Sequence, residues 1–224
     1  KLDNGSIIAI VYYHDFRVII PISEMMLYLS EDKHHYGEMS ERQNKVLSNM
    51  LGAEIDFVVK GLDSKSRSIV ASRKDAMRKK RKVFYLDITN TGQPRVYPGR
   101  VIEARVIAVA EKVVRIEAFG VECSILARDL SYDWLGNAHD LYHVGDKILI
   151  RINEIIGDST DELKIKADVK SVIGDSSREK LKHCKVQGKY VGSITDIHKG
   201  VVFIRLNIGI NAVAHTCYDR RTPA

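Results

Sequence analysis

GRVIEARVIAVAEKVVRIEAFGVECSILARDL, residues 99–130, alternates apolar and polar side chains at a period of two over most of its length. This alternation is typical of half-buried β-strands. Turns expected near Ala110–Glu111 and Phe119–Gly120 divide the stretch into three strands. Short, closely spaced strands with glycine at a turn predict a small β-barrel.

The same pattern recurs on both sides of this stretch. Hairpins are expected within 5–25 and 52–72, two strands within 145–169, and three strands within 188–215. Two segments are expected to be helical: 36–51, with Ser40 and Gln43 as a capping pair, and the basic stretch 72–86. The predicted fold class is all-β with helical connectors.

These units repeat along the chain. LGAEIDFVV (51–59) matches VGDKILIRI (144–152), and a short polar segment follows the expected hairpins as ISEM (22–25), ARDLS (127–131) and HTCYD (215–219). Three copies of one fold account for nearly the whole chain. We therefore expect three tandem five-stranded barrels, of which the first and the last are incomplete.

Several segments together resemble the RNA-binding repeat of ribosomal protein S-one, which is an oligonucleotide/oligosaccharide-binding (OB) barrel. These segments are GVVFIRL (200–206) with the later VAH (213–215), IIPISEM (19–25), VGDKILIRINEI (144–155) and DSKSRSIVAS (63–72). The resemblance implies that 1–86 is a repeat without its first strand, with a helical insertion and a basic C-terminal helix. It implies a linker at 87–98, a complete repeat at 99–173, a linker at 174–187 and a partial repeat at 188–224. We expect the protein to extend upstream of Lys1.

The net charge of +6 lies mainly in one segment, because residues 73–82 hold seven basic residues and one acid. This excess permits an anionic partner. No run of 18 apolar residues occurs, which argues against a membrane partner. The three widely spaced cysteines, Cys123, Cys184 and Cys217, indicate reduced thiols in a cytoplasmic protein.

We find no sequence pattern typical of a catalytic or metal site. A Walker-type loop, a dinucleotide fingerprint and a Gly-x-Ser-x-Gly elbow are all missing from the sequence. The adjacent His34 and His35 lack the spacing of metal ligands. We expect no enzyme activity and no cofactor.

The resemblance implies which side chains contact RNA, by stacking on bases and by tracking phosphates. In the third unit these are Phe203 and His215, which should face each other across a hairpin symmetric about Gly209, with Arg205 on the same face. Alternatively Phe203 is a core residue and His215 a structural one. In the second unit, Trp134 either packs at the barrel mouth or stacks on a base.

In the other units the expected contacts are charged. The second unit has Lys112 and Arg115 at the aromatic positions, which form either a phosphate-binding surface or a solvated strand face. In the first unit Asp63 and Arg67 either pair with each other or present Arg67 to a phosphate. The basic segment offers Arg78, Lys79 and Lys80 to phosphates, or is a solvated helix between two barrels.

The predicted function is non-catalytic binding of single-stranded RNA by several linked modules, which the resemblance places in translation. One alternative is the RNA-binding portion of a larger enzyme, such as a polynucleotide phosphorylase-like exonuclease. A second is a protein-docking array on the ribosome or on a polymerase, since two of the three units lack the Phe/His pair.

Overall fold

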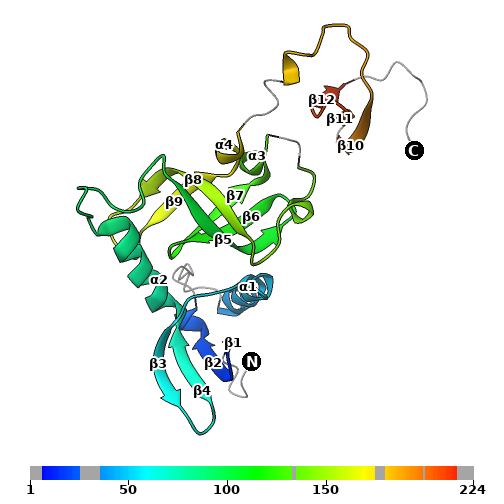
Figure 1. Cartoon of the computed structure of the whole chain (residues 1–224). Helices are drawn as coiled ribbons and strands as arrows, with labels where there is room; N and C mark the ends of the chain where they lie inside the picture. Colours follow the sequence, from blue (N-terminus) through cyan, green and yellow to red (C-terminus); the bar gives the residue numbers. More distant parts are fainter. Residues whose placement is uncertain (1–6, 26–35, 133–134, 175–179, 199, 216–224) are drawn as a thin grey trace.

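The computed structural model describes residues 7–25, 36–132, 135–174, 180–198 and 200–215 (Figure 1). These residues form three β-sheets joined by a few helices, so the prediction of a mainly β protein is confirmed. Of the three expected barrels, the one expected to be complete is present as a nearly closed barrel. The two expected to be incomplete are open sheets, with four and three strands.

The barrel is built from five antiparallel strands in the order β7-β6-β5-β8-β9. Their bounds are β5 Val101–Ala110, β6 Val113–Ala118, β7 Val121–Leu126, β8 Lys147–Ile156 and β9 Lys164–Asp168. The edge strands β7 and β9 lie side by side, and the Ala167 amide donates to the Cys123 sulfur across the remaining gap. Bulges in β5 and β8 bend these two long strands, as barrel closure requires.

Strand alternation explains the barrel core. Ile116, Ile125, Ile150 and Ile152 are each at most 1% exposed and lie in one cluster, to which all five strands contribute. Burying an aliphatic side chain of this size contributes about 1.5–3 kcal/mol. Short helices α3 (Ala127–Leu130) and α4 (Lys170–Ile173) and the helical turn η3 (Ala138–Asp140) lie beside the strands.

The first sheet has the order β1-β2-β4-β3, with strands Ile8–Tyr13, Phe16–Pro21, Ser68–Ser72 and Val58–Asp63 in that order. The turn predicted near His14–Asp15 is confirmed, and so is the helix expected at 36–51, which is α1 (Tyr36–Asn49). The strand expected from residue 52 was wrong in its first part, because 53–57 have no ladder partner and β3 begins at Val58. The turn η1 (Ile22–Glu24) follows β2.

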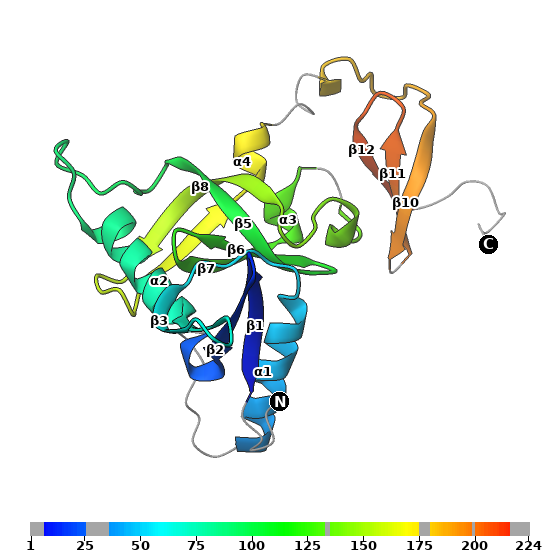
Figure 2. The same cartoon turned by 60° about the horizontal axis from the view of Figure 1, so that its bottom comes forward.

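The third sheet is the antiparallel meander β10 (Gly192–His198), β11 (Val201–Leu206) and β12 (Asn211–Ala214). A shift of 88 residues takes β6 to β11, so the meander repeats the first three strands of the barrel. The meander lies on the side of the barrel that carries α3 and α4 (Figure 2).

The basic segment is not a solvated helix. It forms α2 (Arg73–Arg81) and the π-helical turn η2 (Lys82–Leu86), and it runs between the first sheet and the barrel (Figure 1). Ser72 caps α2, because its hydroxyl accepts a hydrogen bond from the Asp75 amide, with 3.0 Å between Oγ and N. Arg73 and Arg81, at the two ends of α2, are 0% and 1% exposed.

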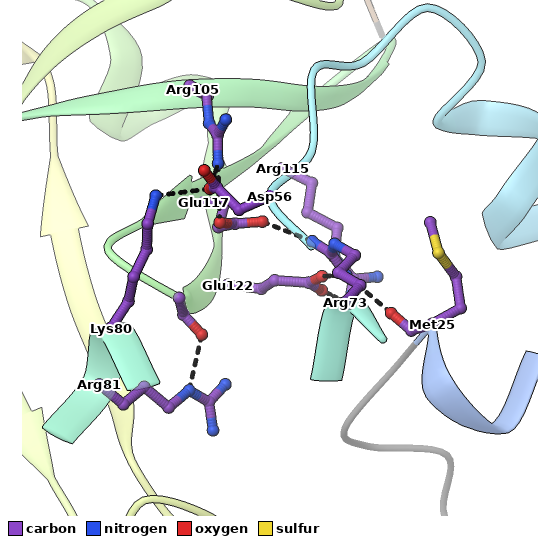
Figure 3. Close-up of polar contacts among 10 residues, drawn as sticks. Met25, Asp56, Arg73, Lys80, Arg81, Arg105, Arg115, Glu117 and Glu122 are labelled. Carbon is purple, nitrogen blue, oxygen red and sulfur yellow. Dashed lines mark hydrogen bonds and ion pairs between the residues drawn. The ribbon is translucent and has the colours of Figure 1, made fainter. Parts of the chain in front are cut away.

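Arg73 is the centre of a buried charge cluster (Figure 3). Its guanidinium lies 2.5 Å from Glu117 Oε2 and 2.8 Å from Glu122 Oε1, and it donates to the Met25 carbonyl at 3.0 Å. Arg115 also pairs with Glu122. Burial opposes ionisation of Glu122, but the charges of Arg73 and Arg115 outweigh it and hold the pKa of Glu122 below its ordinary value.

A second set of ion pairs joins the first unit to the barrel. Asp56, from the first unit, pairs with Lys80 of α2 at 2.5 Å and with Arg105 of β5. Arg105 also donates to Glu117 Oε1 at 3.1 Å, which links this set to Arg73. The first unit and the barrel are therefore held together by ion pairs that are fully buried at Arg73 and about one third exposed at Lys80 and Asp56.

Close backbone packing and an apolar contact complete this junction. Arg81 Nε donates to the Gly120 carbonyl at 2.6 Å, and a Cβ at Gly120 would lie 2.4 Å from the Met77 carbonyl oxygen. Only glycine fits this turn. Ile107 of β5 is 0% exposed and packs into the core of the first unit, with Val18 and Ile20.

Candidate nucleic-acid interface

A cleft of about 530 Å³ lies between the barrel and the meander. The barrel contributes the β5–β6 turn, α3, the segment after α3 and the start of α4, while the meander contributes all three of its strands. The lining residues are Lys112, Ala127, Arg128, Ser131, Tyr132, Leu135, Lys170, Thr195, Phe203, Ile204, Asn211, Ala212 and Val213. Three of them are cationic and none is acidic.

The cations of this cleft all belong to the barrel. The Arg128 side chain is 78% exposed, with Nε 3.6 Å from Asp129 Oδ2. Lys170 Nζ lies 3.1 Å from Asp129 Oδ1 and donates to the Arg128 carbonyl at 3.1 Å. Lys112 Nζ donates to the Gly136 carbonyl at 2.5 Å. Asp129 pairs with two of the three cations and no acidic residue lines the cleft, so the cleft has a net positive charge.

Two aromatic side chains, one from each body, line the same cleft. Tyr132 is 48% exposed, and Lys170 Nζ lies 6.0 Å from the centroid of its ring. Phe203 comes from β11 and is half-buried. An exposed ring beside a cation offers a base a stacking surface and its phosphate a charge partner.

The predicted pairing of Phe203 with His215 was wrong. In the β11–β12 ladder Phe203 faces Val213, and Val202 faces Ala214. The hairpin turn is centred on Ile208, because the Gly209 amide donates to the Leu206 carbonyl, and this moves the register by two residues. His215 is exposed and lies one residue beyond the end of β12.

Arg205 was expected on the face of Phe203. It lies two residues further along β11, pairs with Asn211 in the ladder and donates to Asn211 Oδ1 at 3.1 Å. Asn211 itself lines the cleft. Arg205 is therefore held beside the cleft, on the strand that carries Phe203.

The other residues that were predicted to contact RNA lie on different parts of the molecule. Lys112 lines the cleft, whereas Arg115 belongs to the buried charge cluster through Glu122. On α2, Arg78 makes a bidentate pair with Asp161 at 2.7 and 2.9 Å, Lys80 pairs with Asp56, and Lys79 is exposed. These residues do not form one surface.

Asp63 and Arg67 lie at the tip of the β3–β4 hairpin. Asp63 accepts hydrogen bonds from the Ser66 hydroxyl at 2.7 Å and the Lys65 amide at 3.0 Å, and these bonds lower its pKa. The alternative of an Asp63–Arg67 ion pair is not realised within the described chain. Arg67 is exposed and has a φ of +49°, a turn conformation.

Arg128, Tyr132 and Lys170 were not identified from the sequence as contact residues. They follow the third and fifth strands of the barrel, in the segments ARDLSYDW (127–134) and DVKSV (168–172). They come together only when the barrel closes. Their proximity could have been predicted only from the order in which the strands pair, which the sequence pattern does not give. Trp134 and the pair His34–His35 lie outside the described residues.

No group of three or more His, Cys, Asp or Glu side chains suited to a metal ion occurs in the described ranges. Within the part of the chain that the structure describes, no helix is long and apolar enough to span a membrane.

Comparisons with known proteins show a distant relationship. No family model matches the chain. It is 20% identical to the small ribosomal subunit protein bS1 of Coxiella burnetii over 166 residues, which is 73% of this chain and 28% of that protein. A solved chain in the a/eIF2alpha–aDim2p–rRNA complex of Pyrococcus horikoshii is 17% identical, with a TM-score of 0.31, covering 39% of this chain and 52% of that one. The chain is thus distantly similar to a bS1 protein and spans less than a third of its length.

Proposed function

We propose that this chain is a non-catalytic RNA-binding protein that holds single-stranded RNA in the cleft between the barrel and the meander. The observation that carries the proposal is the gathering of Lys112, Arg128 and Lys170 around two aromatic rings. The distant similarity to bS1 supports RNA binding as the general activity. A role in translation, in contact with the ribosome, is the context that we propose on the same ground.

The lining of the cleft offers RNA two kinds of contact. The barrel supplies cations, which attract phosphates regardless of base sequence. Tyr132 and Phe203 supply π-surfaces, and each stacked base contributes about 1–3 kcal/mol. Because the two bodies are covalently linked, a strand bound by one is presented to the other at a high effective concentration.

The salt dependence of binding tests this proposal. We expect the affinity for a fluorescent single-stranded RNA of about 12 nucleotides to fall steeply as salt rises from about 50 to 200 mM. Arg128→Ala should make the slope of log affinity against log salt shallower by about 0.7, which is the value for one phosphate contact on a single strand. Fluorescence anisotropy over a salt series gives both quantities.

Lys79→Ala is the matched control, because it removes one exposed cation of α2 outside the cleft. It should leave the slope unchanged. A loss of slope in Lys79→Ala equal to that in Arg128→Ala would move the binding site to α2. An absence of binding at low salt would reject RNA binding by this chain.

A further inference from the structure

A strongly basic loop, residues 180–190, lies between the barrel and the meander; we call it the lysine loop. The stretch 180–195 holds four lysines and no aspartate or glutamate. Lys182, Lys185 and Lys189 are exposed, and none of the three forms an ion pair within the described residues. The lysine loop therefore presents at least three positive charges to solvent.

The basic helix α2 differs from the lysine loop in this respect. Arg73, Arg78 and Lys80 of α2 each pair with a carboxylate. Arg81 donates to backbone carbonyls, including that of Gly120 at 2.6 Å. Much of the charge of α2 is thus used inside the protein, whereas the charge of the lysine loop is open to an external anion.

Local hydrogen bonds hold the backbone of the lysine loop. The Gly188 amide donates to the Lys185 carbonyl at 3.0 Å, and the Lys185 amide donates to the Tyr190 hydroxyl at 2.7 Å. The Tyr190 ring packs against Gly188, where a Cβ would lie 2.7 Å from a ring carbon. The three exposed lysines thus extend from a folded turn, and their mutual repulsion favours the binding of a polyanion.

The lysine loop adjoins the cleft on the side of the meander. It passes the end of the meander at which β11 turns into β12 (Figure 2), where a Cβ at Gly209 would lie 2.9 Å from Lys180 Nζ. Just beyond the loop, the Val191 carbonyl accepts a hydrogen bond from the Asn207 amide at 2.9 Å. Asn211, two residues after Gly209, lines the cleft. A strand that leaves the cleft past Asn211 therefore meets the lysine loop next.

We propose that the lysine loop binds the phosphates of an RNA strand as it leaves the cleft, regardless of the identity of the bases. The choice of RNA as the anion rests on the proposed function, because the loop and the cleft are neighbours. Lysine binds a phosphate as a point charge and needs no base beside it. The lysine loop thus lengthens the binding site by contacts to the RNA backbone, whereas Tyr132 and Phe203 in the cleft act on the bases.

An RNA strand without bases is the probe that separates these two kinds of contact. We expect the intact chain to bind a fluorescent abasic strand of about 12 ribose-phosphate units at about 50 mM salt, and to lose affinity steeply as salt rises. Combining Lys182→Gln, Lys185→Gln and Lys189→Gln should make the slope of log affinity against log salt shallower by about 2, at about 0.7 for each phosphate contact. Tyr132→Ala should leave this slope unchanged, because the probe offers no base for stacking.

The matched control combines Lys65→Gln, Lys79→Gln and Lys82→Gln, which removes the same charge at three exposed lysines outside the lysine loop and the cleft. It should leave the slope unchanged. Equal changes of slope in the two triple variants, or no binding of the abasic strand at about 50 mM salt, would overturn the proposal. Equal competition by a polyglutamate peptide of the same charge would assign the loop to an acidic protein and would also overturn it.

Failure of the cleft as the RNA site would give a different result. Arg128→Ala and Tyr132→Ala would then leave the binding of a base-containing RNA unchanged, while the lysine-loop variant would still weaken binding of the abasic strand. That outcome would support the lysine loop and reject the cleft. The opposite outcome, in which the cleft variants weaken RNA binding and the lysine-loop variant behaves like the intact chain with the abasic strand, would reject the lysine loop alone.

Discussion

Arg73→Met is expected to lower the free energy of unfolding by about 3–5 kcal/mol, the largest effect that we predict for a single side chain. The Arg73 guanidinium is fully buried, and the Glu117 carboxylate with which it pairs is 1% exposed. Methionine fills much of the arginine volume but removes the buried cation that pairs with both Glu117 and Glu122, and leaves Glu117 with Arg105 as its remaining charge partner. Urea denaturation followed by circular dichroism measures the change.

Arg78→Met is the matched control on the same helix. Its ion pair with Asp161 is exposed on both sides, so the expected loss is only about 0–1 kcal/mol. Adding Glu117→Gln to Arg73→Met removes the buried carboxylate charge that has lost one of its two cations, and should recover part of the lost stability. If Arg73→Met and Arg78→Met had equal costs, the assignment of a buried charge cluster between the first unit and the barrel would be contradicted.

The second large effect is expected on RNA binding. Tyr132→Ala and Phe203→Ala should each weaken the binding of single-stranded RNA by about 1–3 kcal/mol, or about 5- to 150-fold, because each removes one stacking surface. The two rings come from different bodies, so the double variant should lose the sum of the two effects. Fluorescence anisotropy at one fixed low salt concentration measures the three variants.

Tyr97→Ala provides the control for these variants. Tyr97 is 40% exposed and has Arg100 at 5.5 Å from its ring, but it lies outside the cleft. Its loss should leave the affinity unchanged, although it removes a similar ring beside a similar cation. An equal loss of affinity in Tyr97→Ala would show that exposed aromatic rings outside the cleft contribute as much to RNA binding, and would contradict the assignment of the cleft as the binding site.

Strand periodicity was sufficient to predict most of the β-structure. The alternation in 99–130 predicted β5, β6 and β7, and the nearly closed barrel follows from the pairing of β5 with β8 and of β8 with β9. The position of the β11–β12 turn was wrong, because glycine at 209 follows the centre of the turn at Ile208. Turn centres depend on backbone hydrogen bonds, which residue types alone do not determine.

The role of the basic helix was not predictable from its own residues. Its composition indicates a solvated or phosphate-binding surface, whereas Arg73 is neutralised by Glu117 and Glu122, which lie more than 40 positions away in the sequence. The cleft was not predictable from the sequence for the same reason. Lys112, Arg128 and Lys170 are far apart along the chain and meet only after the barrel closes.

The most direct test of the account is to locate the bound RNA by photo-crosslinking. A single-stranded RNA that contains 4-thiouridine is irradiated with the full chain, and mass spectrometry identifies the crosslinked residues. We predict crosslinks at Tyr132 and Phe203, on the two sides of the cleft. Crosslinks confined to the exposed lysines of α2 and η2, Lys79 and Lys82, would contradict the account.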